Sequence, residues 1–366
     1  MILNKAFKYR LYPNESQQEL IQKTFGCCRF IYNKMLDDKI NFYKENGLKL
    51  NNTPAQYKQE YEWLKEVDSY ALCNEQMHLQ SAYNNFFRDK KAGFPKFKSK
   101  KRDKKSYSTS NVNNIIRVND KHQIHLSKLG WVKFVEHRQI PQDYRIKSAT
   151  ISQTASGKFY ISILTEYEYS ISEIELDKDK SIGLDYSSHS FYVDNQNRET
   201  ENYRRLFRES EDRLAKEQRK LSQMQFGSNN YYKQKIVVAK IHEHIANQRK
   251  DFIEKLSTSL SNKYDIVCIE DLNMQGTAQS LKLGKSTNDN GFGMFKTRLQ
   301  QKLEIQGKKL IKIDRWFPSS KMCRFCGTIN QNLTLADRIW KCDCGETLNR
   351  DENAAINILN EGLTLI

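Results

Sequence analysis

Three acidic residues stand where a chain of alternating strands and helices presents side chains to a ligand. Asp185 ends the apolar stretch SIGLD, Glu270 ends DIVCIE, and Asp351 opens the helical stretch RDENAAINIL. Ligands of α/β sheets lie beyond the carboxyl ends of the strands, so these carboxylates could converge. Converging carboxylates can hold the two divalent cations that hydrolyse a phosphodiester. An acid after a strand is also a common turn residue or N-cap, so both interpretations stay open.

A cluster of four cysteines indicates a second metal site. Cys323 and Cys326 form one pair, and Cys342 and Cys344 form another after a spacer of fifteen residues. Two close pairs separated by a hairpin-length spacer are typical of a four-thiolate zinc ribbon, although Cys-x-Cys is one residue shorter than the usual pair. Four thiolates leave no open coordination position, so this zinc would be structural. The alternative is a set of buried or redox-active thiols.

The composition favours a polyanionic partner. The 366 residues include 60 Lys and Arg against 44 Asp and Glu, a formal net charge of +16. Nucleic acid is the leading candidate, although a merely soluble basic protein would have the same balance. The 19 Tyr and 18 Phe could stack bases as well as fill cores. No stretch approaches the roughly 20 apolar residues of a membrane-spanning helix, and the start lacks a secretory signal, so we expect a cytoplasmic protein without a membrane partner.

The elements that must position these residues differ between the two halves of the chain. In the first half, KAFKYRLYP alternates like a strand, residues 14–87 have helical spacing, and residues 115–168 are strand-like. Residues 88–105 form a cationic run with Gly93 and Pro95, which predicts loop or extended chain. We therefore expect a β-domain that combines the first strand with the later ones and carries an inserted set of helices.

In the second half, strands and helices alternate. A strand, a turn and a strand are predicted in SIGLDYSSHSFYVD, and two helices follow in residues 203–260, with a break near GSNN. DIVCIED is then a buried strand, FKTRLQQKLEIQ a helix and KLIKID another strand. This alternation implies an α/β domain with at least partly parallel pairing.

The predicted fold class is α/β plus all-β, in four domains. They are a small β-domain (residues 1–12 and 94–175), a helical domain (13–93), an α/β domain (176–318 and 347–366) and a zinc ribbon (319–346).

The motifs, taken in order, resemble one known family. Seven stretches of the second half resemble TnpB, the accessory nuclease of small bacterial insertion sequences. In chain order they are GLDYS, the basic stretches RLAKEQRKLS and HIANQRKDFIEKLSTSL, then IEDLNMQG, WFPSSKMCRFCG, CDCG and NRDENAAINIL. The opening KAFKYRLYPN, with CCRFIYN, YNNFFR and GFPKFK, looks like the same family. The resemblance covers nearly the whole chain, and several independent motifs occur in the same order.

This resemblance implies both a fold and an activity. The α/β domain would be a RuvC-like nuclease of RNase H fold with a helical hairpin insertion and a zinc ribbon. The β-domain would be a wedge-like β-barrel and would carry a helical recognition insert. The expected reaction is RNA-guided cleavage of double-stranded DNA beside a short transposon-adjacent motif. The expected partners are a guide RNA from the transposon end and the target DNA, in a bacterial cytoplasm and at the nucleoid when DNA is bound. A monomer and an RNA-bridged oligomer both stay open.

The resemblance also implies roles for individual residues. Asp185, Glu270 and Asp351 match the three acids that bind two catalytic Mg²⁺ ions, and the four clustered cysteines match a structural Zn²⁺ site. In WLKEVDSYALC, Ser69, Tyr70 and Cys73 are similar in position to the helix that reads the adjacent motif.

The cations of the first loop and of the helical hairpin would form a channel that follows the phosphates of a guide–target heteroduplex. Any one of them could equally lie on a solvated helix face. The candidates are Lys96, Lys98, Lys100, Lys101, Arg102, Arg204, Arg205, Lys216, Arg219, Lys220, Arg249 and Lys250.

Three other functions fit parts of the sequence. A repressor that binds guided DNA without cutting would lack one of the acids, and all three are present. A compact type V CRISPR effector shares the nuclease domain but takes a CRISPR guide, which the neighbouring DNA would reveal. A transposase that joins DNA strands itself is compatible with an RNase H fold, but the resemblance favours guided cleavage.

Overall fold

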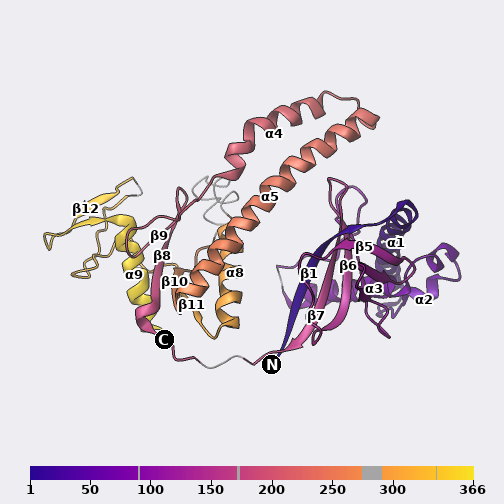
Figure 1. Ribbon diagram of the computed structural model, residues 1–366, viewed down its shortest axis with the longest axis horizontal. Helices are drawn as coiled ribbons and strands as arrows, with labels where there is room; N and C mark the ends of the chain where they lie inside the picture. The colour runs from indigo at the N-terminus through magenta and orange to yellow at the C-terminus, as the bar shows by residue number, and fades with distance from the viewer. Residues whose placement is uncertain (90, 171–173, 274–290, 335) are drawn as a thin grey trace. The chain divides into compact units, whose positions relative to one another are not determined.

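The protein is described by a computed structural model, which covers residues 1–89, 91–170, 174–273, 291–334 and 336–366. It divides into two compact units, Met1–Tyr169 and Ser170–Ile366, each described by itself below (Figure 1). Both units mix helices with a β-sheet. Within the described residues, no helix is both long and apolar enough to cross a membrane.

A seven-stranded antiparallel sheet forms the centre of the first unit. Its strands are β1 (Ile2–Tyr12), β2 (Lys105–Ser110), β3 (Arg117–Asn119), β4 (Gln123–Leu126), β5 (Gly130–Val135), β6 (Arg145–Gln153) and β7 (Phe159–Glu168). They lie in the order β2-β6-β7-β1-β5-β4-β3. β1 pairs with β7 along most of its length and with β5 at its end, from Arg10 to Tyr12. The predicted combination of the first strand with the later ones is therefore confirmed.

The sheet differs from the predicted barrel in one respect. In the part of the chain that the structure describes, β2 and β3 each have a single neighbour, so the sheet is an open half-barrel with two edges. β2 is also a strand that the sequence pattern does not predict. Its sequence, KSYSTS, follows the cationic run, and only Tyr107 and Thr109 are buried. All six residues of β2 pair with β6, so this pairing makes the segment a strand although its side-chain pattern does not predict one.

The predicted helical insert lies between β1 and β2. It contains α1 (Glu15–Asn46), the short α2 (Pro54–Tyr57), the 3₁₀ turn η1 (Glu62–Lys65) and α3 (Ser69–Arg88). Asn14 caps α1 reciprocally with Gln17, since each side chain accepts a hydrogen bond from the backbone N–H of the other. The helix ends at Gly47, whose φ of 68° is left-handed. Buried faces of α1 and α3 share one hydrophobic core with the sheet.

The second unit has a four-stranded sheet in the order β11-β10-β8-β9. β10 pairs in parallel with both β8 and β11, and β8 pairs antiparallel with β9, which confirms the predicted α/β alternation. The elements are β8 (Ser181–Ser187), β9 (Phe191–Asp194), α4 (Leu206–Ser222), α5 (Asn229–Lys263), β10 (Ile266–Glu270), α8 (Phe292–Ile305), β11 (Lys309–Ile313), β12 (Ile339–Lys341), β13 (Thr347–Asn349) and α9 (Arg350–Thr364). The 3₁₀ turn η2 (Lys178–Lys180) precedes β8.

Helix α9 lies against the sheet at van der Waals distance because two glycines leave room for it. A Cβ atom at Gly183 of β8 would lie 2.1 Å from the carbonyl oxygen of Ala355 in α9. A Cβ atom at Gly362 of α9 would lie 2.4 Å from Sγ of Cys268 in β10. This close approach fixes the first turn of α9 beside the strands that carry Asp185 and Glu270.

Gly183→Ala should therefore destabilise the second unit. The added methyl group meets backbone, which cannot rotate away, so we expect the free energy of unfolding to fall by about 1–3 kcal/mol. Gly293→Ala is a matched control, because no atom lies within 4 Å of a Cβ at Gly293, in α8. It should leave stability unchanged or raise it slightly. Calorimetry combined with hydrogen exchange at β8 would measure both variants, and equal stability would contradict the proposed contact.

Candidate active site and metal centre

The three predicted acids lie in one neighbourhood of the second unit. Asp185 is in β8, Glu270 is the last residue of the adjacent parallel strand β10, and Asp351 is in the first turn of α9. Burial raises the pKa of Asp185 well above its ordinary value, and the charges of Glu270 and Asp351 raise that pKa further. Such coupling is consistent with Glu270 and Asp351 each lying near Asp185.

Glu270 is held by a residue that the sequence analysis missed. Burial raises the pKa of Glu270, and the hydrogen bond donated by the hydroxyl of Ser319 opposes that shift. Ser319 is held in turn by α9, because its carbonyl oxygen accepts from Nδ2 of Asn357 at 2.8 Å. Asn353, also buried, donates to the carbonyl oxygen of Met322 at 2.7 Å. The sequence offers one signal for the contact between α9 and the segment of Ser319 and Met322. Asn353 and Asn357 stand four residues apart, on one face of an otherwise apolar helical stretch.

Asp351 is paired with two arginines that the sequence analysis also missed. Nη1 of Arg338 lies 2.6 Å from Oδ2 of Asp351, and Nη2 of Arg350 lies 2.9 Å from Oδ1. Asn349 caps α9 and accepts a hydrogen bond from the backbone N–H of Asp351. Both arginines also lower the pKa of Asp185, so they partly offset the charge of the three acids. Among the described residues the three carboxylates do not converge as closely as the cysteines do.

The four clustered cysteines do converge. All four sulfur atoms lie within 4.8 Å of one another. Cys323 Sγ is 3.7 Å from Cys344 Sγ, and Cys326 Sγ is 3.5 Å from Cys342 Sγ. Four sulfurs at about 2.3 Å from a tetrahedral zinc ion would be about 3.8 Å apart, so the cluster fits a structural zinc site.

The local fold explains why these sulfurs converge. Cys342 and Cys344 lie in the turn between β12 and β13, and Cys323 and Cys326 lie in a second turn closed by a hydrogen bond from the N–H of Gly327 to the carbonyl oxygen of Cys323. Hydrogen bonds with Thr328, and then with Cys342 and Cys344, lower the pKa of Cys326 to about 6. Burial and the contacts with Cys326 raise the pKa of Cys342 and Cys344, so without a metal the cluster favours a thiolate at Cys326 in particular. The small core beneath the cluster contains Leu333, Trp340 and Leu348.

The candidates for reading an adjacent DNA motif lie in the first turns of α3. Ser69 and Cys73 are exposed, and Tyr70 is half-buried. Nζ of Lys58 donates to the hydroxyl oxygen of Ser69 at 2.7 Å. No described contact assigns a ligand to these three positions, so their role stays a prediction.

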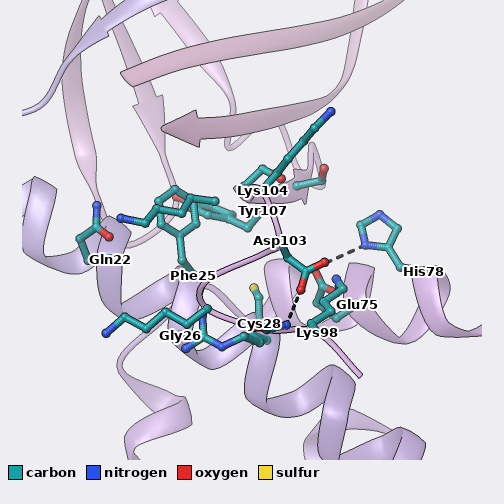
Figure 2. A pocket seen from close by; sticks show the side chains of 16 residues that line it. Gln22, Phe25, Gly26, Cys28, Glu75, His78, Lys98, Asp103, Lys104 and Tyr107 are labelled. Carbon is teal, nitrogen blue, oxygen red and sulfur yellow. Dashed lines mark hydrogen bonds and ion pairs between the residues drawn. The ribbon is translucent and has the colours of Figure 1, made fainter. Parts of the chain in front are cut away.

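In the first basic loop, Lys98 differs from its neighbours. Lys96, Lys100, Lys101 and Arg102 are exposed, whereas the ammonium of Lys98 pairs with Glu75 and lies 4.3 Å from the ring centroid of Tyr32. Glu75 has a side chain that is only 2% exposed, and it also faces His78. Lys98, Glu75 and His78 line one side of a pocket of about 380 Å³ (Figure 2). Lys98 therefore anchors the loop to α3, and the phosphate role of its exposed neighbours stays a prediction.

The cations of the helical hairpin are partly engaged with protein groups. Lys216, Arg219 and Lys250 are exposed. The others have partners or lie closer to the protein: Arg204 pairs with Glu209, Arg205 with His189 and Lys220 with Glu217, and Arg249 is half-buried with its side chain close to Gly291.

Three family models match the chain. They are a helix-turn-helix domain over residues 1–48, a probable transposase over residues 162–281 and a Cas12f1-like TNB domain over residues 292–358. Residues 1–48 consist mainly of β1 and the single long helix α1 in this structure. The third match contains β11, the cysteine cluster and the start of α9.

Two relatives align with almost the whole chain. A Streptomyces pristinaespiralis protein named as an RNA-guided DNA endonuclease is 32% identical over 99% of this chain and 90% of its own length. The Escherichia coli K12 protein InsQ, with the same description, is 30% identical over 98% and 92%. The solved Cas12f1 chain, in complex with sgRNA and target DNA, matches with a TM-score of 0.58 over 98% of this chain and 99% of that one. Its 13% identity shows a shared fold alone.

Metal analysis should find about one zinc ion per chain. Cys326→Ser should lose that zinc and destabilise the second unit, because thiolate coordination adds directly to the folding free energy. Cys73→Ser, which removes an exposed cysteine outside the cluster, should keep it. Well-folded wild-type protein that contains no zinc would show that the assignment is wrong.

Asp185→Asn should raise the thermal stability of protein freed of divalent cations. Folding raises the pKa of Asp185. Above the pH at which an ordinary Asp ionises, the folded state must carry this negative charge against burial and against the neighbouring acids, so the ionised carboxylate lowers the free energy of unfolding. At pH 8 we expect the unfolding midpoint to rise by on the order of 2–4 °C, and the gain should shrink as the pH falls towards about 4.

Asp212→Asn, which changes an exposed acid of α4, is the control and should leave the midpoint unchanged. Equal midpoints for Asp185→Asn and the wild type at pH 8 would mean that the three acids do not repel one another.

Proposed function

The chain belongs to the TnpB family of RNA-guided DNA endonucleases, and we propose that it cleaves double-stranded DNA chosen by pairing with a guide RNA. The guide would come from the transposon end, and the target would lie beside a short transposon-adjacent motif. The single observation that carries this proposal is the placement of the acids: Asp185 and Glu270 lie towards the ends of the paired parallel strands β8 and β10, and Asp351 lies in the first turn of the helix packed on them.

The donor chemistry of the acids suits two Mg²⁺ ions. Hard divalent cations prefer carboxylate oxygens. A bound cation also removes the repulsion between neighbouring ionised acids, so it stabilises such a cluster more than an isolated acid. When bound, such ions lower the pKa of an attacking water and neutralise charge on the leaving oxygen of a phosphodiester. Asp185, Glu270 and Asp351 would hold them.

The protein's other groups orient those acids. Ser319 donates a hydrogen bond to Glu270 and so selects one direction for the carboxylate. Arg338 and Arg350 hold Asp351 from two sides, and the burial around Asp185 limits the access of bulk water. Their positive charge also favours the approach of a phosphate to a site that is otherwise acidic.

The elements suggest a part for each region of the chain. The sheet β11-β10-β8-β9 with α9 supports a RuvC-like nuclease domain of RNase H type, and β12 with β13 belongs to the zinc ribbon. The open sheet of the first unit would be the wedge-like domain, and its helices the recognition insert. Ser69, Tyr70 and Cys73 would read the adjacent motif. The exposed lysines and arginines named above would follow the heteroduplex phosphates.

The other candidate functions have less support. A repressor needs guided binding without cleavage, and the three coupled acids have no purpose in it. A compact type V CRISPR effector would share the chemistry and differ in the origin of the guide, which sequencing of co-purified RNA would identify.

The reaction can be tested on one labelled target. Protein reconstituted with its transposon-end RNA and Mg²⁺ should cut matching double-stranded DNA that carries the adjacent motif, and omission of Mg²⁺ should stop the cutting. Asp185→Ala should lower the cleavage rate by on the order of 10²–10³-fold or more while guided binding stays intact or tightens, because a carboxylate near the phosphates is lost.

Asp212→Ala is the matched control and should cut at the wild-type rate. Equal cleavage by wild type and Asp185→Ala would contradict the catalytic assignment. Guided binding without cleavage by the wild type would favour the repressor.

A further inference from the structure

Four aromatic rings form a surface cluster near the end of α3. Tyr83, Phe86 and Phe87 belong to the helix, and Phe94 belongs to the loop that follows. The ring centroids are 6.4 Å apart for Tyr83 and Phe87, 5.6 Å for Tyr83 and Phe94, 5.2 Å for Phe86 and Phe87, and 5.4 Å for Phe86 and Phe94. Each ring therefore contacts two others in a closed set, which we call the aromatic quartet.

The quartet is ordered by its own contacts although much of it faces solvent. Phe87 is 70% exposed and Phe94 is 45% exposed. Of the four residues, Tyr83 packs against the hydrophobic core of the first unit, and the other three are not part of that core. Exposed phenylalanine rings forgo the stabilisation that burial would give, so a preformed exposed set of them indicates a binding surface.

One cation lies against the quartet, and others flank its residues in the sequence. Nζ of Lys49 lies 5.8 Å from the ring centroid of Phe87. Arg88 and Lys91 follow Phe87 in sequence, and Lys96 follows Phe94; all three are exposed. One exposed acid, Asp89, lies in the same stretch, so the segment has a net positive charge. Rings flanked by cations match a ligand that presents flat apolar faces together with negative charge.

We propose that the aromatic quartet stacks unpaired nucleobases of single-stranded nucleic acid while the flanking cations contact its phosphates. The inference rests on the proposed function, because it takes nucleic acid as the partner. A nucleotide offers a π face and an anion within one residue, which fits this surface better than an apolar protein segment does. Stacking is tolerant of sequence, since every base has a π face, so the platform suits a strand whose sequence varies.

The test compares two labelled oligonucleotides of roughly 12 nucleotides, one of deoxythymidine and one abasic, with the same backbone charge. The full-length double variant Phe87→Ala/Phe94→Ala should bind the thymidine probe about 10-fold more weakly and the abasic probe as the wild type does. Phe226→Ala, which removes a ring 73% exposed outside the quartet, is the matched control and should change neither affinity.

Two further variants separate stacking from charge and from misfolding. Phe87→Leu/Phe94→Leu keeps apolar bulk without an aromatic face, so it should fold like the wild type and still lose the preference for bases. Lys49→Met should weaken both probes alike and lower the salt slope of binding by about one. A 5-iodouracil probe should crosslink on irradiation to Phe87 or Phe94.

Three results would overturn the inference. The first is an unchanged preference for bases in the Leu double variant, and the second is an equal loss of affinity for both probes in that variant. The third is self-association of the wild type that the variant abolishes, because it would assign the quartet to contact with a second copy of the chain. Guided cleavage is measured separately. If the wild type cuts guided DNA but the quartet variants keep their preference for bases, only this inference is overturned and the proposed function stands. A wild type that does not cut overturns the proposed function whatever the probes show.

Discussion

The close approach of helix α9 to the sheet is the constraint on which the second unit depends. Gly183 in β8 and Gly362 in α9 are the points where a side chain would collide with backbone or with Cys268. Because α9 is fixed there, its first turn delivers Asp351 to the strands that carry Asp185 and Glu270. The same helix holds Ser319 and Met322 through Asn353 and Asn357, so it also positions the hydroxyl that orients Glu270. One packing contact thus organises three acids from distant parts of the chain.

Bringing acidic side chains near one another is unfavourable, and the hairpin of the cysteine cluster helps to offset the cost. Arg338 lies directly before β12, and its carbonyl oxygen accepts a hydrogen bond from the N–H of Arg350 at 2.9 Å. A hairpin held by the cysteine cluster therefore places Arg338 where its guanidinium meets Asp351. Zinc would act on the candidate active site through this arginine, although four thiolates leave zinc itself no place for a substrate.

In the first unit, the cationic segment after α3 serves two purposes. Lys98 holds the segment to the helices through Glu75 and Tyr32, and Asn33 bonds both the N–H and the carbonyl oxygen of Lys98. The neighbouring cations stay exposed, and so does part of the aromatic quartet. An internal ion pair thus anchors a charged loop against its own repulsion, while most of its lysines and arginines stay exposed.

The sequence alone determined the order of the elements and the parallel strands of the second unit, and it singled out the four cysteines and the three candidate acids, because alternation, helical spacing and short motifs are local properties. Tertiary structure decided the rest. KSYSTS is a strand only because β6 pairs with it, and the sheet is open because β2 and β3 have no further partner among the described residues. Ser319 and Arg338 meet the acids through contacts between segments far apart in the sequence, whereas Arg350 pairs with the residue directly after it. Whether a lysine such as Lys98 binds phosphate or a buried glutamate depends on what the fold places beside it, and a charge in a sequence does not specify its partner.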